Sequence, residues 1–418
     1  MGWSSTPEAT ENSAKENEEE LLVTTGHPEL IAAISSEIIR NGPIPFVRFM
    51  ELALYHPQFG YYMRKPVGMD HERIGWSGDF YTSSDVHPIL GRAIAAQARQ
   101  MDELLGCPTP FTIVEMGAGK GLLIRDCLAA IHAGQDDFAS RVRCVLIERS
   151  PAMRELQRRN LTHWLSKPDL VTWVEDLGEL VPQSVTGLFF SNELIDALPV
   201  HRIQVTDGQT EELCVDYRDG DFVSCLKPLS TSALARYLQQ LNTAWPEGYR
   251  TEVSTQALGW MEQVARLMDR GFVVTIDYGH TAQDLYGPER KDGTFLCYFR
   301  QQTNDDPFIR IGEQDMTAHV DFSNLASAGE KQGLHVTGFT NQMSFLMGLG
   351  VEGMIGELKP ESPEFRAAIH LLKPNGMGST FKVLIQHKGI DHPELDGLKF
   401  KPFFGSALAQ HESNVLTS

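Results

Sequence analysis

The residues best suited to chemistry in this chain form one short run, Glu115-Met-Gly-Ala-Gly-Lys-Gly121. Glu115 ends an apolar, β-rich stretch that starts at Phe111, and a helical pattern starts at Leu122. Glycines at alternate positions let the backbone turn tightly and approach a ligand closely, because no Cβ intrudes. A helix behind such a turn directs free N–H groups at the same point. The run therefore predicts a strand, a glycine turn and a helix that together bind a nucleotide-like cofactor.

The glycine spacing narrows the choice of cofactor. A dinucleotide site requires G-x-G-x-x-G, but the last glycine position falls on Leu122. A Walker loop requires Ser or Thr after its lysine, but Lys120 is followed by glycine. The order E-x-G-x-G-x-G instead resembles the first motif of class I S-adenosylmethionine-dependent methyltransferases. A carboxylate suits a cofactor with a positive ammonium group and would repel a pyrophosphate. We expect the cofactor to contact Glu115, Gly117, Ala118, Gly119 and Gly121, against the alternative of a glycine turn without a ligand.

Two further strand ends could complete a cofactor site, because ligands of open α/β sheets bind at the carboxyl ends of the strands. Glu148 ends the strand candidate Arg143–Glu148 and is placed to accept both hydroxyls of a ribose. Its alternative role is a solvated charge before the helix of Pro151–Arg158. After the third strand, the segment from Trp173 to Asp176 could face an adenine ring, although an aromatic there is more often part of a core.

The fourth strand ends in the polar run Asn192-Glu-Leu-Ile-Asp-Ala-Leu-Pro199. Asn192 and Glu193 would lie beside a transferring group, and Glu193 with Asp196 could bind a cationic substrate. The alternative is a helix start that is capped by Asn and has acids in its first turn. The fifth strand leaves Asp277 and His280, which could act as acid, base or substrate contact, or could be hydrogen-bonded structural groups.

The sequence predicts that an α/β doubly wound sheet positions these candidate residues. The strand candidates are 111–115, 143–148, 171–174, 185–190 and 272–277, with helices between most of them. Residues 335–339 and 380–386 could supply an antiparallel closing pair. Residues 200–226 contain two Asp-Gly steps and predict a β-meander, which we expect to decorate the sheet together with a helix at 232–241.

The same pattern divides the chain into four parts. We expect a disordered acidic tail (1–26), a helical N-terminal segment with an active-site cover (27–108), a methyltransferase domain with an insertion at about 200–250 (109–388), and a flexible C-terminal tail (389–418). The helices predicted in the second part cover 27–40, the stretch after Pro45, and 88–105.

Composition excludes several classes of protein. The net charge of −19 over 418 residues disfavours a nucleic-acid partner. No apolar run approaches the roughly 20 residues of a membrane span, and the six cysteines show no zinc-binding spacing, so we expect no metal. The Glu-rich first 20 residues resemble neither a secretory signal nor a transit peptide, which predicts a cytoplasmic protein.

Six motifs, taken in order, resemble the MidA-like family of S-adenosylmethionine-dependent methyltransferases, to which the mitochondrial complex I assembly arginine methyltransferase belongs. They are Tyr55-His-Pro-Gln-Phe-Gly-Tyr-Tyr62, Gly78-Asp-Phe-Tyr-Thr82, the glycine run, Asn192–Pro199, Asp277-Tyr-Gly279 and Asp315-Met-Thr-Ala-His-Val-Asp321. The chain departs from the family at Ser84-Asp85, where Pro-Glu is usual, and at Gln301, where His is common. The resemblance implies a class I fold, S-adenosylmethionine as cofactor and symmetric dimethylation of arginine in a protein partner.

The resulting hypothesis assigns the grip on a guanidinium to Glu193, with Asn192 beside the methyl group and Asp79 and Asp277 as secondary candidates. The acidic chain suits a partner with a basic surface, and a homodimer is possible. Two alternatives stay open: a non-catalytic S-adenosylmethionine-binding assembly factor, and a methyltransferase of small molecules. A nicotinamide oxidoreductase fails on the glycine spacing.

Overall fold

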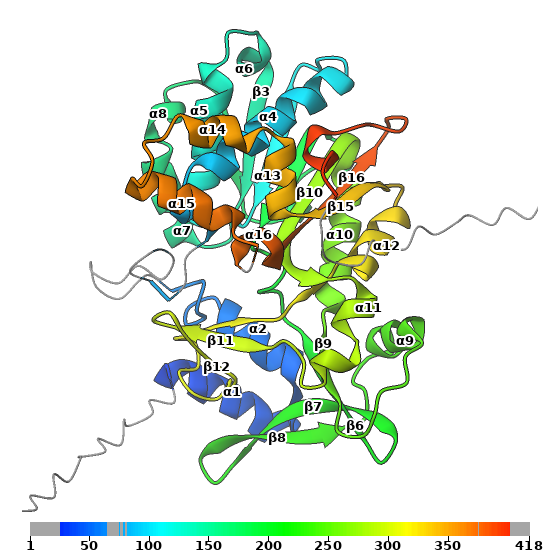
Figure 1. The fold of residues 1–418 in the computed structure, drawn as a ribbon. Helices are drawn as coiled ribbons and strands as arrows, with labels where there is room; N and C mark the ends of the chain where they lie inside the picture. The colour runs from blue at the N-terminus through cyan, green and yellow to red at the C-terminus, as the bar shows by residue number, and fades with distance from the viewer. Residues whose placement is uncertain (1–25, 65–74, 76–77, 80–81, 375, 402–418) are drawn as a thin grey trace, which may run out of the picture.

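A computed structural model describes residues 26–64, 75, 78–79, 82–374 and 376–401 (Figure 1). Its largest sheet has the strand order β15-β16-β10-β5-β2-β3-β4. These strands are β2 (Phe111–Met116), β3 (Val142–Ile147), β4 (Val171–Val174), β5 (Val185–Asn192), β10 (Met268–His280), β15 (His335–Asn341) and β16 (Phe381–Lys388), while the short β14 (Val320–Asp321) pairs with β10. All seven predicted strands are present. The chain order reverses beside β2, where a doubly wound sheet forms its ligand crevice.

The closing strands confirm the predicted class of α/β sheet. The pairs β3–β4, β2–β3, β2–β5 and β5–β10 are parallel. In contrast, β16 runs antiparallel to both β10 and β15, with Thr275 opposite Leu384. This arrangement is the antiparallel end that a class I methyltransferase fold requires.

Helices cover both faces of this sheet, because successive side chains of a strand point to opposite sides. Ile113 and Phe190 face the core formed with α4 (Ile89–Leu104), α5 (Leu122–Ala133), α13 (Gln342–Gly348) and α15 (Pro363–Leu372). Val114 and Phe189 face the core formed with α10 (Thr255–Leu267) and α12 (Phe322–Glu330). In the upper half of Figure 1 the two helical layers lie on either side of the sheet.

The predicted meander is present but forms a sheet of its own. Strands β6 (His201–Thr206), β7 (Gln209–Arg218) and β8 (Asp221–Lys227) are joined at the two Asp-Gly steps, whose Asp and Gly residues all have positive φ. β9 (Arg250–Val253) pairs with β6, and β1 (Ile44–Pro45) pairs with β7. The helices α1 (Pro28–Asn41) and α2 (Phe46–Tyr55) share a core with this second sheet. The meander therefore makes the lower half of Figure 1 with the N-terminal helices, rather than decorating the large sheet.

A third sheet was not expected from the sequence. It consists of β11 (Leu296–Phe299), β12 (Gln302–Asn304) and β13 (Asp315–Thr317) in the order β12-β11-β13. Strands of three or four residues are too short to show a period of two. The remaining helices are α3 (Ser83–Val86), α6 (Phe138–Arg141), α7 (Pro151–Asn160), α8 (Thr162–Leu165), α9 (Ser232–Leu241), α11 (Ala282–Leu285), α14 (Val351–Gly356), α16 (Met377–Thr380) and the 3₁₀ turns η1 (Leu177–Glu179), η2 (Pro288–Arg290) and η3 (Asp396–Leu398).

The chain is packed further toward its C-terminus than the predicted flexible tail from residue 389 implies. Leu395 is buried in the main core, and the N–H groups of Asp396 and Gly397 donate to Gln100 and Gln97 of α4. Residues 402–418 and 1–25 of the two predicted tails lie outside the described residues, as do Phe80 and Tyr81 of the Gly78–Thr82 motif. Among the described helices, none combines the length and apolar character needed to cross a bilayer.

Candidate active site

A cavity of about 260 Å³ lies at the carboxyl ends of β2, β3, β4 and β5. On the side of the large sheet it is lined by residues 115–120, 147–150, 175–176 and 192–194. On the other side it is lined by residues of α2 and of the segments that follow it, namely Glu51, Tyr55, Tyr62, Met63, Thr82, Ser84 and Asp85. The cavity is thus built from both halves of the molecule, at the crevice where doubly wound sheets bind their ligands.

The glycine run takes the predicted strand, turn and helix form. Gly117, Gly119 and Gly121 have φ of 76°, 50° and 76°, a region that L side chains rarely adopt. A Cβ on Gly117 would lie 2.8 Å from the side chain of Leu194. Gly117, Ala118 and Gly119 line the cavity, whereas Gly121 lies behind them as the N-terminal cap of α5. At Gly117 and Gly119 the loop therefore offers backbone without a side chain to a ligand.

Glu115 has the clearest need for a ligand. Its side chain is 2% exposed, and Oε2 has no hydrogen-bond partner within the described structure. Burial raises the pKa of Glu115 to about 8. A buried acceptor without a donor is unfavourable unless something binds to it. The positive ammonium group of S-adenosylmethionine would supply both the charge and the N–H donors, so this residue fits the predicted cofactor.

Glu148 and Asp176 also line the cavity, at the ends of β3 and β4. Glu148 accepts hydrogen bonds from the Ser150 N–H (2.7 Å) and from Gln157 Nε2 (3.1 Å). Burial raises its pKa, while these donors oppose the rise. Asp176 is exposed and caps η1 by accepting from the Gly178 N–H (2.7 Å). The two donors thus fix the carboxylate of Glu148 in the cavity wall, whereas the carboxylate of Asp176 has a local structural role.

Asn192 and Glu193 lie at the end of β5, in the cavity wall. Glu193 has φ of 53°, a conformation that a non-glycine residue adopts mainly where the surroundings impose it. Its Oε1 accepts from the N–H of Ser83 and from Asn192 Nδ2, each at 3.0 Å. Asn192 is buried, and its Oδ1 has no partner in the described structure. Burial raises the pKa of Glu193 to about 8.

Asp277 and Asp79 do not line the cavity among the described residues. Asp277 is fully buried, and its Oδ2 accepts from the N–H groups of residues 194–196 at 2.8–3.3 Å, so it anchors the loop that carries Glu193. Burial raises its pKa to about 7, against the effect of these N–H groups. Asp79 accepts from Tyr61 Oη (2.8 Å) and from the Arg300 N–H (2.9 Å). Both residues position backbone segments.

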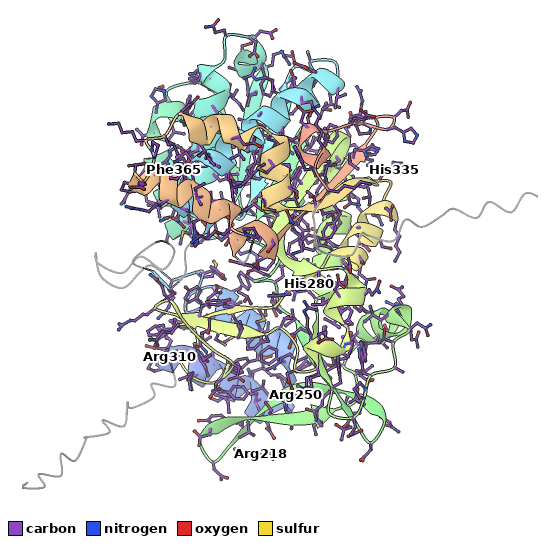
Figure 2. The ribbon with its side chains drawn as sticks, viewed as in Figure 1. Arg218, Arg250, His280, Arg310, His335 and Phe365 are labelled. Atoms are coloured by element: carbon purple, nitrogen blue, oxygen red, sulfur yellow. The ribbon has the colours of Figure 1, made fainter. Side chains whose placement is uncertain are left out.

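His280, which the sequence offered as a candidate, is paired with a second histidine, His319. His280 lies at the end of β10 (Figure 2). One of its ring nitrogens is 3.1 Å from a ring nitrogen of His319. Burial and the charge of Arg290 lower the pKa of His280 to about 3 and that of His319 to about 4. Both rings are therefore neutral at pH 7 and lie outside the cavity lining.

The described residues contain no cluster of three His, Cys, Asp or Glu suited to a metal ion.

Some residues of the site were missed from sequence. Tyr55 and Tyr62 stack at 5.5 Å in the cavity wall, and Tyr62 donates to Asp315 Oδ1 (2.7 Å), 253 positions away. Lys120 of the glycine run forms an ion pair (2.5 Å) with Asp85, which is one of the residues that depart from the family pattern. The aromatic content of residues 55–62 was a signal for the tyrosines, but no local pattern indicates their partners.

Comparisons with known proteins identify the chain as a methyltransferase. A family model for S-adenosyl-L-methionine-dependent methyltransferases matches residues 90–340. The chain is 29% identical over 427 residues to "Protein arginine methyltransferase NDUFAF7 homolog, mitochondrial" of Drosophila melanogaster, covering 95% of this chain and 93% of that protein. It is 26% identical to the Homo sapiens protein of that name, with coverage of 87% and 84%.

A solved structure resembles the whole fold. The crystal structure of a COG1565 superfamily member from Burkholderia thailandensis, bound to S-adenosyl-homocysteine, superposes with a TM-score of 0.78 at 30% identity, covering 88% of this chain and 94% of that chain. A native crystal structure of a COG1565 superfamily protein from the same organism gives a TM-score of 0.76 at 29% identity, covering 89% of this chain and 95% of that chain.

The expectation of a cytoplasmic protein is wrong, because the curated relatives are named mitochondrial. The composition of the first 20 residues, on which that expectation rested, does not decide the compartment. The comparisons do bear out the fold, the cofactor and the class of enzyme. The chain belongs to the MidA-like family of S-adenosylmethionine-dependent methyltransferases.

Proposed function

We propose that this methyltransferase modifies the guanidinium group of an arginine in a protein partner. The observation that carries the proposal is the Asn192–Glu193 pair in the cavity wall. Glu193 Oε1 is engaged by two donors, so Oε2 is left for a ligand, and Asn192 Oδ1 has no donor among the described residues. Because Asn192 Nδ2 donates to Glu193, the amide orientation is fixed and its oxygen remains an acceptor. Two neighbouring acceptors match two N–H groups of a guanidinium.

The charges around this pair support a cationic substrate. Besides burial, the negative charges of Asp277 and Asp85 raise the pKa of Glu193. Besides burial, the charges of Asp277, Asp315 and Glu193 likewise raise the pKa of Asp196. Like charges in a buried site disfavour ionisation, and a bound cation reverses that effect. A guanidinium stays charged in water because its pKa is above roughly 12. Its binding would therefore favour the ionised form of Glu193.

The residues of the site divide the work of methyl transfer. When bound, S-adenosylmethionine supplies a methyl group on a positively charged sulfur. Glu115 would hold its ammonium group and Glu148 its ribose, while the Gly117–Gly119 backbone leaves room for it. Glu193 would orient the substrate nitrogen, and its Oε2 would accept the proton that this nitrogen must lose. Positioning of this kind supplies most of the rate in such reactions.

The relatives extend the proposal to the product and the compartment. They are named protein arginine methyltransferases and mitochondrial, so we infer a protein substrate inside mitochondria. Symmetric dimethylation follows from the family resemblance, and the charge of −19 suits a partner with a basic surface. A homodimer stays a prediction, as do the limits of the predicted domains.

The test is methyl incorporation from labelled S-adenosylmethionine into mitochondrial proteins by purified native protein and by Glu193→Gln. We expect label on arginine, with fragment ions of symmetric dimethylarginine, and loss of the label in the variant at unchanged cofactor affinity. Label on a small molecule alone would favour the small-molecule alternative. Tight cofactor binding without any transfer would favour a non-catalytic assembly factor. Unchanged methyl transfer by Glu193→Gln would refute the proposal that Glu193 binds the guanidinium.

A further inference from the structure

One buried polar residue joins three neighbouring parts of the cofactor site without lining the cavity. Gln157 lies on α7 and is 0% exposed. Its Nε2 donates to the Gly119 carbonyl oxygen (2.9 Å) and to Glu148 Oε2 (3.1 Å). Its Oε1 accepts from Trp173 Nε1 (2.9 Å). One side chain thus connects the glycine turn after β2 with the ends of β3 and β4.

The position of Gln157 on its helix is unusual for a glutamine. It is the one residue of α7 that is buried, at a place where an apolar side chain would be the ordinary choice. Burying an amide is unfavourable unless its donors and acceptor are satisfied, and here both kinds of atom are used. Gly119 and Glu148 belong to the predicted cofactor site, and Trp173 begins the segment that could face an adenine ring. Packing of α7 against the sheet alone would not require a side chain with both hydrogen-bond donors and an acceptor at this position.

The contact also gives the third glycine of the motif a purpose. Gly121 does not line the cavity, but a Cβ there would lie 3.2 Å from Gln157 Cγ. With φ of 76° the position also favours glycine for conformational reasons. Gly121 therefore allows α7 to approach the turn closely enough for Gln157 to reach Gly119. The last glycine of E-x-G-x-G-x-G acts on the cofactor site through this side chain.

We propose that Gln157 is a positioning residue of the cofactor site, which holds the Glu148 carboxylate and the Gly119 carbonyl in the arrangement that receives the ribose. Glu148 Oε1 is fixed by the Ser150 N–H and Oε2 by Gln157, so the carboxylate cannot rotate and keeps acceptor capacity on both oxygens. The inference rests on the proposed ribose role of Glu148. It adds a residue that acts through Glu148 and does not touch the cofactor.

A double-mutant cycle separates positioning from a general structural role. S-adenosylhomocysteine affinity is measured by calorimetry for the native protein, Gln157→Leu, Glu148→Ala and the double variant. Gln157→Leu should weaken binding about tenfold, which corresponds to one hydrogen bond to a charged group. In the Glu148→Ala background the same change should weaken it less than about threefold, because the partner is gone. Methylthioadenosine, which has the ribose but no amino-acid part, should show the same pattern.

The matched control is Gln97→Leu, which removes another buried glutamine, on α4, whose partners are Gln100 and Gly397. None of these three residues lines the cavity. Gln97→Leu should lower thermal stability without changing cofactor affinity. If Gln157→Leu does not fold, Gln157→Met fills similar space and gives the same readouts.

Two results would overturn the proposal, and they distinguish failure of the positioning role from failure of the ribose assignment. Equal losses from Gln157→Leu in both backgrounds would make Gln157 a structural residue only, with the ribose role of Glu148 intact. Unchanged affinity in Glu148→Ala would remove the ribose assignment itself, and the positioning role with it.

Discussion

Glu115 leads to a prediction in which stability and cofactor binding change in opposite directions. Replacing Glu115 with Gln keeps the size of the side chain but removes an ionisable group that the cofactor-free protein buries. The pKa of Glu115 rises from 4.5 to about 8 on folding because burial disfavours the charged form. The folded state therefore binds this proton more tightly than the unfolded state does.

The sign and size of the effect follow from linkage. Below pH 4.5 the Glu115 carboxyl is protonated in both the folded and the unfolded state, so it does not reduce the stability of the native protein. As the pH rises toward 8, the unfolded chain loses the proton while the folded chain keeps it, so the native protein loses stability. At about 1.36 kcal/mol per pKa unit, the loss is roughly 3 kcal/mol at pH 7 and levels off at roughly 5 kcal/mol above pH 8. Glu115→Gln should avoid this loss.

The assay is denaturant unfolding of both proteins without cofactor at pH 5, 6, 7 and 8, with calorimetric titration of S-adenosylhomocysteine alongside. The stability advantage of Glu115→Gln should grow with pH, while its affinity for the ligand falls at least tenfold because an ammonium partner is lost. A control with the opposite sign is Asp102→Asn, whose buried carboxylate binds Arg141 through two bonds of 2.6 and 2.7 Å and whose loss should destabilise the protein. A pH-independent difference between native protein and Glu115→Gln would refute the reasoning.

Three further predictions concern the neighbouring residues. Methyl transfer at low substrate concentration should rise roughly tenfold between pH 7 and 9, because Glu193, with a pKa of about 8, must be ionised to bind a cation. The rate of Glu193→Gln should be flat over that range. Asp277→Ala should lower the transfer rate at least tenfold with little change in calorimetric cofactor affinity, because the loop of residues 194–196 loses its anchor; equal losses in both would contradict this role. Gly117→Ala should abolish cofactor binding, measured by equilibrium dialysis, because the added Cβ would contact Leu194 and an alanine is strained at this positive φ. The control Gly208→Ala, in an open turn that also has positive φ, should leave cofactor binding intact.

Long, strongly patterned elements were predictable from the sequence. The apolar runs that form β2 and β5 and the Asp-Gly turns of the meander leave little choice of structure, and all are present. The glycine spacing and Glu115 were sufficient to choose the cofactor class. The three-residue strands β12 and β13 could not be seen, because a period of two needs more residues to show itself.

The roles within the site were harder to predict, because they depend on contacts between distant parts of the chain. Asp79, Glu193 and Asp277 are all acids in motifs, and each accepts from a backbone N–H group. Only the structure shows that Glu193 lines the cavity and that the other two do not. Gln157 lies in a helix whose pattern gives no hint of a buried amide. The ion pair between Lys120 and Asp85 likewise joins residues 35 positions apart.

A crystal structure of the protein with S-adenosylhomocysteine would test the central claim most directly. The account predicts the ammonium group within hydrogen-bond distance of Glu115, both ribose hydroxyls on Glu148, and the sulfur directed toward Asn192 and Glu193. A ligand whose ribose lies away from Glu148, or whose sulfur points away from Glu193, would contradict it.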